Sequence, residues 1–270
     1  MKIYIFAVIL WISSGFSYSE SHNKNNGNFK INVELAEQGD MDAQYNLGLM
    51  YYNGEGVTAN AKMAFNLYKL AAEQGHMNAQ YNLGVMFANG EGVTADVKES
   101  ASFYRLAADQ GYMKAQYNLG LMHIKGEGVT PDFKIAASFF RLASEQGYME
   151  AQYILAVMYD IGEGVDTDIK MAVRFFKLAA EQGHMKAQYS LGLLYYKGEG
   201  VISDAKIAVS FFRLAAKQGH MCAQNKLGFM YSNGEGVTVD NKMAVSLYRL
   251  ASVQGDMDAQ YNLGVMHATG

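Results

Sequence analysis

The chain has 270 residues, 50% of them hydrophobic, and its 22 basic and 26 acidic side chains give a formal net charge of −4. This composition supports a packed core and excludes a disordered, charge-rich chain. Acids and bases are interspersed without a basic stripe, so nucleic acid is not an expected partner.

The first 19 residues have the features of an export signal. Lys2 precedes an unbroken apolar run at residues 3–12, and residues 17–19 form a small-x-small cleavage site. The apolar run would span only about 15 Å as a helix, half the hydrocarbon thickness of a bilayer, so a transmembrane anchor is the weaker interpretation. We therefore expect cleavage after Ser19, a periplasmic or secreted protein, and no stable membrane span after cleavage.

A polar linker at residues 20–28 leads into a chain that repeats itself every 36 residues without insertion. The dipeptide Ala-Gln marks the register and begins at Ala43, Ala79, Ala115, Ala151, Ala187, Ala223 and Ala259. A period of this size indicates a stack of supersecondary units. We divide the remainder into a degenerate half repeat at 29–38, six complete repeats at 39–254 and a partial seventh repeat at 255–270.

The first half of each repeat predicts an amphipathic helix, called helix A. In residues 41–53, Ala43, Leu47, Met50 and Tyr51 share one face at i, i+4, i+7 and i+8. Gly54 follows where a left-handed C-terminal cap is needed.

The second half predicts helix B, which Asn60 would cap and which would run to Gln74 before Gly75. Its expected buried face consists of Ala64, Leu67, Tyr68 and Ala71. Neither helix can bury its apolar face alone, so stacked neighbours must supply the core.

The complete pattern carries a family resemblance. It reads Ala43-x-x-x-Leu47-Gly48-x-x-Tyr51-x-x-Gly54-x-Gly56-Val57, then the cap at Asn60, Ala64, Leu67-Tyr68, Ala71-Ala72 and Gly75. This pattern resembles the Sel1-like repeat, a relative of the tetratricopeptide repeat. The resemblance implies an all-α fold, a right-handed α/α superhelix (solenoid) of helix-turn-helix repeats. The cysteine pairs of the cysteine-rich secreted members are missing.

The resemblance also implies a function. We expect a scaffold or adaptor that binds a protein or peptide in a concave groove outside the cytoplasm, with a secreted host-interaction factor as one form of it. The alternatives are a penicillin-binding or β-lactamase-like enzyme of the cysteine-rich branch and an envelope glycan-binding protein. The enzyme would need a serine or lysine constellation that we do not find, and the glycan binder would need an exposed tyrosine ladder. We predict no enzyme activity, no catalytic residue and no cofactor.

The face of helix A opposite the core is the expected binding surface, because helix A lines the groove in superhelices of this kind. Three positions on that face, including those of Tyr52 and Asn53, vary strongly inside an otherwise constant repeat, although surface drift would produce the same variation. The groove candidates are Tyr52, Asn53, Ile124, Lys125, Asp160, Ile161, Tyr196, Lys197, Ser232 and Asn233. A tyrosine ladder that starts at Tyr45 runs beside them, and we favour packing over ligand binding for it.

Other polar residues that recur among the repeats have structural interpretations. His76, His184 and His220 share a turn position in repeats that lie about 10 Å apart, so they cannot easily share one zinc ion, and we predict no metal site. The glutamate of the Gly-Glu-Gly-Val loop, such as Glu55, would serve loop geometry, capping or a pair with the lysine seven residues later, such as Lys62.

The single cysteine and the C-terminal segment raise questions of self-association. Cys222 stands at a repeat position that is otherwise polar, so we expect a solvent-facing residue that is either an intermolecular thiol or a chance substitution. The partial seventh repeat would expose an apolar stripe formed by Ala259, Leu263 and Met266. We expect this uncapped helix to fray or to pair with another chain.

Overall fold

The computed structural model describes residues 25–269, and every regular element in that range is an α-helix. The predicted signal sequence at residues 1–19 lies outside the described residues. The helices are α2 (Asn25–Glu37), α3 (Met41–Asn53), α4 (Ala61–Glu73), α5 (Met77–Asn89), α6 (Val97–Asp109), α7 (Met113–Lys125), α8 (Phe133–Glu145), α9 (Met149–Ile161), α10 (Ile169–Glu181), α11 (Met185–Lys197), α12 (Ala205–Lys217), α13 (Met221–Asn233), α14 (Asn241–Val253) and α15 (Met257–Thr269).

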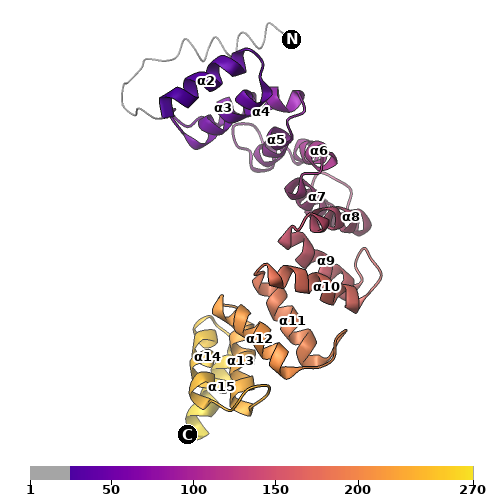
Figure 1. The fold of residues 1–270 in the computed structure, drawn as a ribbon, viewed down its shortest axis with the longest axis vertical. Coiled ribbons are helices and arrows are strands. Elements are labelled where there is room, and N and C mark those ends of the chain that lie inside the picture. The colour runs from indigo at the N-terminus through magenta and orange to yellow at the C-terminus, as the bar shows by residue number, and fades with distance from the viewer. Residues whose placement is uncertain (1–24, 270) are drawn as a thin grey trace. The chain divides into compact units, whose positions relative to one another are not determined.

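The chain packs as two units that divide between Pro131 and Asp132. In the first unit, α2 to α7 pack each against the next, and in the second unit α8 to α15 do the same (Figure 1). Helices A and B alternate throughout: α3, α5 and α7 are A helices of the first unit, and α9, α11, α13 and α15 are those of the second. The expected all-α fold of repeated helix-turn-helix pairs is confirmed.

The predicted helix ends are confirmed by their caps. The α3 helix ends at Asn53, Gly54 is left-handed with φ 75°, and its N–H donates to the Met50 carbonyl. The Asn60 side chain accepts a hydrogen bond of 3.0 Å from the Met63 N–H at the start of α4. These contacts satisfy backbone groups that a helix end leaves unpaired.

The predicted apolar faces form the cores of both units. Ala43, Leu47, Met50 and Tyr51 are buried, as are the four predicted residues of helix B. Gly48 lets α3 and α4 approach closely, because a Cβ atom at Gly48 would lie 2.6 Å from Cε1 of Tyr68. The small residue at this position therefore sets the helix–helix distance.

A glutamine on each helix A joins neighbouring helices within the core. The buried Gln44 donates through Nε2 to the Ala36 carbonyl at 3.3 Å and accepts from Gln74 at 2.8 Å. Gln188 repeats this arrangement with the Ala180 carbonyl at 3.1 Å and Gln218 at 2.8 Å. The glutamines satisfy buried polar groups where helix termini meet, which explains why the Ala-Gln dipeptide marks the register.

The N-terminal half repeat differs in extent from its prediction. Helix α2 begins at Asn25, inside the segment assigned to the polar linker, whereas the half repeat was placed from Phe29. Phe29 and Val33 pack against the core of the first unit. The polar residues before Phe29 continue the same helix by one turn, which apolar periodicity does not reveal.

Candidate functional site

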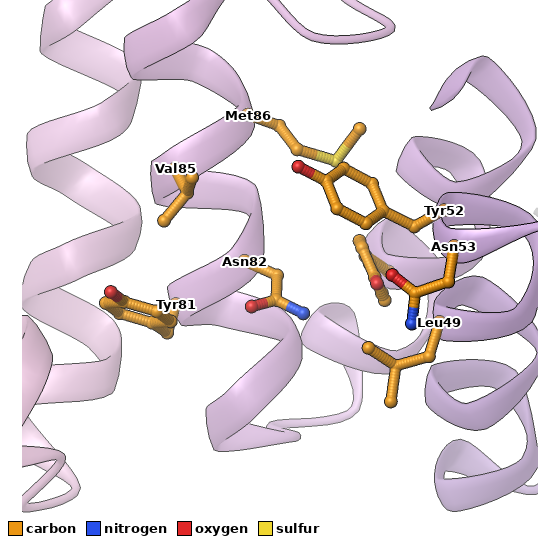
Figure 2. A pocket seen from close by; sticks show the side chains of 8 residues that line it. Leu49, Tyr52, Asn53, Tyr81, Asn82, Val85 and Met86 are labelled. Carbon is orange, nitrogen blue, oxygen red and sulfur yellow. The ribbon is translucent and has the colours of Figure 1, made fainter. Parts of the chain in front are cut away.

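The outer faces of α3 and α5 enclose a cavity of about 300 Å³ (Figure 2). Its lining residues are Leu49, Tyr52 and Asn53 of α3, Tyr68 of α4, and Tyr81, Asn82, Val85 and Met86 of α5. Two of the groove candidates, Tyr52 and Asn53, thus lie at one pocket. We call these eight residues the α3–α5 pocket.

Tyr52 forms the exposed rim of the pocket and is held by the loop that follows α5. Its hydroxyl donates a hydrogen bond of 2.5 Å to Glu91, whose carboxylate also accepts from Asn89 at 2.8 Å. The bond to Glu91, the largest effect, raises the pKa of Tyr52. None of the ion pairs in the described part of the chain includes Glu91. The pocket therefore has a carboxylate at its rim that no cation neutralises.

Tyr68 places a hydroxyl in the wall of the pocket. Only 1% of the residue is exposed, and no hydrogen-bond partner of good geometry lies near its oxygen in the described part of the chain. The Asn82 amide projects into the pocket (Figure 2) and is close enough to lower the pKa of Tyr68, but burial has the larger effect and raises it. The Tyr68 hydroxyl therefore has a nearby amide but no hydrogen bond of good geometry, which is uncommon for a buried hydroxyl.

The same positions of a later repeat form a second site, between α11 and α13. Tyr196 corresponds to Tyr52, Glu235 to Glu91, and Lys226 to Asn82. The Lys226 ammonium lies 3.8 Å from the centre of the Tyr196 ring and 4.9 Å from that of Phe229. A hydrogen bond to Glu235 raises the pKa of Tyr196, and burial lowers the pKa of Lys226 while the Glu235 charge opposes this.

The remaining groove candidates occupy separate local environments. Ile161 is 57% exposed, Asp160 and Asn233 are also exposed, and Ile124 is half-buried. Ser232 donates to the Phe229 carbonyl at 2.8 Å. None of these residues lines the α3–α5 pocket.

The loop glutamates account for part of the variation at the position of Asn53. Asn53 donates to Glu55 at 2.9 Å, and Lys197 lies 3.6 Å from Glu199. Lys125 and Glu127 form the corresponding pair at 3.8 Å. Among the described residues, no ion pair joins these glutamates to the lysine seven residues later. The asparagine or lysine at this position thus contacts the loop glutamate two residues later.

The tyrosine ladder packs against neighbouring aromatic rings at Tyr45 and Tyr153. Tyr45 is half-buried and stacks on His76, with ring centres 4.3 Å apart, at the start of the next helix A. Tyr153 and His184 stack at the same distance. Tyr261 on α15 differs, because it is 73% exposed. The exposed aromatic row that the glycan-binding alternative requires is therefore lacking at Tyr45 and Tyr153.

The turn histidines cap helices. Nδ1 of His76, His184 and His220 accepts a hydrogen bond of 3.1 to 3.2 Å from the backbone N–H three residues later. Asp40 and Asp256 do the same in α3 and α15. Over residues 25–269, no cluster of three or more His, Cys, Asp or Glu side chains could hold a metal ion.

Cys222 and the last helix both differ from their predicted exposure. Cys222 is half-buried instead of solvent-facing, and burial, followed by the charge of Asp256, raises the pKa of its thiol. Ala259 is fully buried, and Leu263 and Met266 pack on the core that α14 provides. The predicted apolar stripe therefore packs on α14, with Ala259 fully buried and Leu263 and Met266 half-buried. Self-association through α15 and an intermolecular role for Cys222 remain predictions.

Three residues of the two sites were not predicted from the sequence. Asn82 and Lys226 share a repeat position that was not assigned to the outer face, and Tyr68 was assigned to the core alone. The sequence did hold a signal, since Lys226 stands where Asn46, Asn82, Asn118 and Asn262 occur. Ile154 and Ser190 also replace the asparagine at this position, but Lys226 is the replacement that carries a charge.

The repeats match a known family. Residues 42–76, 78–112, 114–148, 150–184, 186–220, 223–256 and 258–270 match the Sel1 repeat. No curated protein matches the chain. None of the helices between residues 25 and 269 is both long and apolar enough to cross a membrane.

The solved structures that are similar to the chain include two with at least 30% identity. One is c5321, a protective antigen present in uropathogenic Escherichia coli strains that displays an SLR fold, with a TM-score of 0.84 and 36% identity over 88% of this chain. This chain covers only 51% of the c5321 structure. The other is a Sel1 repeat protein from Oxalobacter formigenes, with a TM-score of 0.69 and 30% identity, covering 83% of this chain and 96% of that one.

Proposed function

We propose that this chain, which belongs to the Sel1 repeat family, is a non-catalytic scaffold that binds a protein or peptide partner on the outer faces of its A helices. Sel1 repeat proteins are generally protein-interaction scaffolds, and this coarser role applies to the family as a whole. The observation that carries the proposal is the α3–α5 pocket, which combines an apolar floor with an exposed tyrosine and side-chain amides. Pockets of this composition bind by burying an apolar group and fixing its orientation with a few polar contacts.

A selection from a random peptide library against the full chain tests this function. Peptides enriched on the full chain should bind Tyr52→Ala at least about tenfold more weakly, because an aromatic rim residue is a typical hot spot. The melting temperature should stay nearly unchanged, because Tyr52 is exposed. Fluorescence anisotropy with labelled peptides gives both affinities.

Leu106→Ala is the matched control, since Leu106 is 49% exposed on α6 of the same unit and does not line the pocket. It should leave peptide affinity unchanged. The proposal fails if no peptide is enriched, or if the enriched peptides bind Tyr52→Ala as tightly as they bind the unchanged chain.

We further infer that the protein acts outside the cytoplasm, in the periplasm or beyond the cell. The apolar run after Lys2 and the small residues up to Ser19 support this inference. N-terminal sequencing of the protein produced in a Gram-negative bacterium should give Glu20 as the first residue. An intact Met1 would contradict it.

A further inference from the structure

The α3–α5 pocket and the Tyr196 site are two versions of one repeat position, and the difference between them identifies a ligand. Both have a helix A tyrosine beside a loop glutamate: the Tyr52 hydroxyl donates to Glu91, and Glu235 raises the pKa of Tyr196. Both have an apolar residue on the next helix A, Val85 or Phe229. They differ at the position that faces the tyrosine ring.

At the Tyr196 site the chain supplies its own cation. The Lys226 stem extends from α13 until its ammonium lies 3.8 Å from the centre of the Tyr196 ring. The Glu235 carboxylate attracts the same ammonium, as its opposing effect on the pKa of Lys226 shows. An ammonium between an aromatic face and a carboxylate is stabilised by both the ring quadrupole and the opposite charge.

At the α3–α5 pocket the equivalent residue is Asn82, whose side chain is shorter than that of lysine and carries no charge. The space is left as a cavity of about 300 Å³. Glu91 has no cationic partner in the described structure, and the Tyr68 hydroxyl in the wall has no hydrogen-bond partner of good geometry. The pocket therefore keeps the acceptors of a cation site without the cation.

We propose that the α3–α5 pocket binds a lysine side chain of the partner protein, in the place that Lys226 occupies within the second unit. The lysine stem would lie on Leu49, Val85 and Met86, and the ammonium would face the Tyr52 ring and Glu91. One of its remaining N–H groups would donate to the Tyr68 oxygen, which has no hydrogen bond of good geometry in the described structure. This inference rests on the proposed function and specifies one residue of the bound partner.

Acidic and purely apolar side chains fit the pocket less well. A carboxylate would be repelled by Glu91, and a purely apolar side chain would leave both Glu91 and the Tyr68 hydroxyl uncompensated. The alkyl stem and charged tip of lysine match a pocket whose floor is apolar and whose rim is acidic.

Nα-acetyl-lysine methylamide is the probe, and its norleucine analogue, which has a similar stem without the ammonium, is the matched control. We expect the NMR methyl signals of Met86, Val85 and Leu49 in the full chain to shift saturably with the lysine probe, with a Kd on the order of 1 mM for so small a ligand. The norleucine analogue should bind at least about tenfold more weakly.

The Tyr196 site suggests a variant that tests the lysine assignment directly. Asn82→Lys places a lysine where Lys226 stands in the second unit, so it should occupy the pocket and abolish the probe-induced shifts. Asn46→Lys makes the same change at the equivalent exposed position of α3, outside the pocket lining, and should leave probe binding intact. Glu91→Gln, which keeps a hydrogen-bond acceptor for Tyr52 but removes the charge, should weaken the probe about fivefold or more.

Three results would each overturn the inference: equal binding of the norleucine analogue, persistent binding to a folded Asn82→Lys chain, or unchanged binding to Glu91→Gln. If library peptides need Tyr52 for binding but have no lysine at the position that contacts Tyr52, the lysine assignment fails. The scaffold function would still stand. If no peptide depends on Tyr52, the scaffold function at this pocket fails instead. The two proposals can therefore be rejected separately.

Discussion

Replacing Gly236 by alanine should lower the free energy of unfolding by about 2 to 5 kcal/mol. Gly236 is the second glycine of a Gly-Glu-Gly-Val loop, with φ 69°, and an added Cβ would lie 2.5 Å from the Ala205 carbonyl oxygen at the start of α12. A left-handed backbone is unfavourable for alanine by about 1 to 2 kcal/mol. Contact with a rigid backbone adds about 1 to 3 kcal/mol, because no side chain can rotate away.

Gly219→Ala separates the two contributions. Gly219 has φ 92°, but nothing lies within 4 Å of its added Cβ. This variant should lose only the backbone contribution of about 1 to 2 kcal/mol. Urea denaturation followed by circular dichroism measures both variants. Equal losses would show that the loop moves aside and that the second glycine does not hold it against the preceding repeat.

This contact also explains why the loop recurs unchanged. The same close approach occurs at Gly92 against the first residues of α4, within the other unit. The loop after each helix A thus packs on the helix B of the repeat before it. A glycine that serves the junction between repeats must be the same at every junction, so the identity of this glycine among the repeats indicates a structural role.

The repeat period predicts the fold well because the pattern of each helix recurs in several repeats. The bounds of α3 and the burial of Ala43 and Leu47 follow from spacing that recurs in every unit. The predicted exposure of α15 was wrong for Ala259, which is fully buried, whereas Leu263 and Met266 are half-buried against α14. Periodicity identifies an apolar face, but it does not show how much of that face the preceding helix already covers.

The candidate site was predicted only in part. Variation drew attention to Tyr52, which does line a pocket, but the pocket also needs Tyr68 from helix B and Asn82 from the next repeat. Whether a core tyrosine leaves its hydroxyl without a partner depends on side chains from three helices. Such a property exists only in the packed arrangement, and a single repeat of sequence does not contain it.

The turn histidines make stability depend on pH. Nδ1 of His184 and of His220 accepts a backbone hydrogen bond at the start of a helix, and an imidazolium has no lone pair there to accept it. Burial lowers the pKa of both residues below the ordinary value for histidine, and the charge of Lys186 acts in the same direction. The folded chain therefore binds fewer protons at these sites than the unfolded chain, and stability falls as the pH falls through the lowered pKa values.

The double variant His184→Asp/His220→Asp should remove this dependence, because Asp40 and Asp256 already cap α3 and α15 in the same way and carboxylates stay ionised. Between about pH 7.5 and about pH 5, the unchanged chain should lose about 1 to 3 kcal/mol more than the variant, the sum of two helix caps. Urea denaturation at several pH values gives the difference. Lost stacking on Tyr153 and Tyr189 shifts the variant by an amount that does not vary with pH, so only the slope tests the argument. Parallel stability curves would show that the two histidines hold their caps in either protonation state.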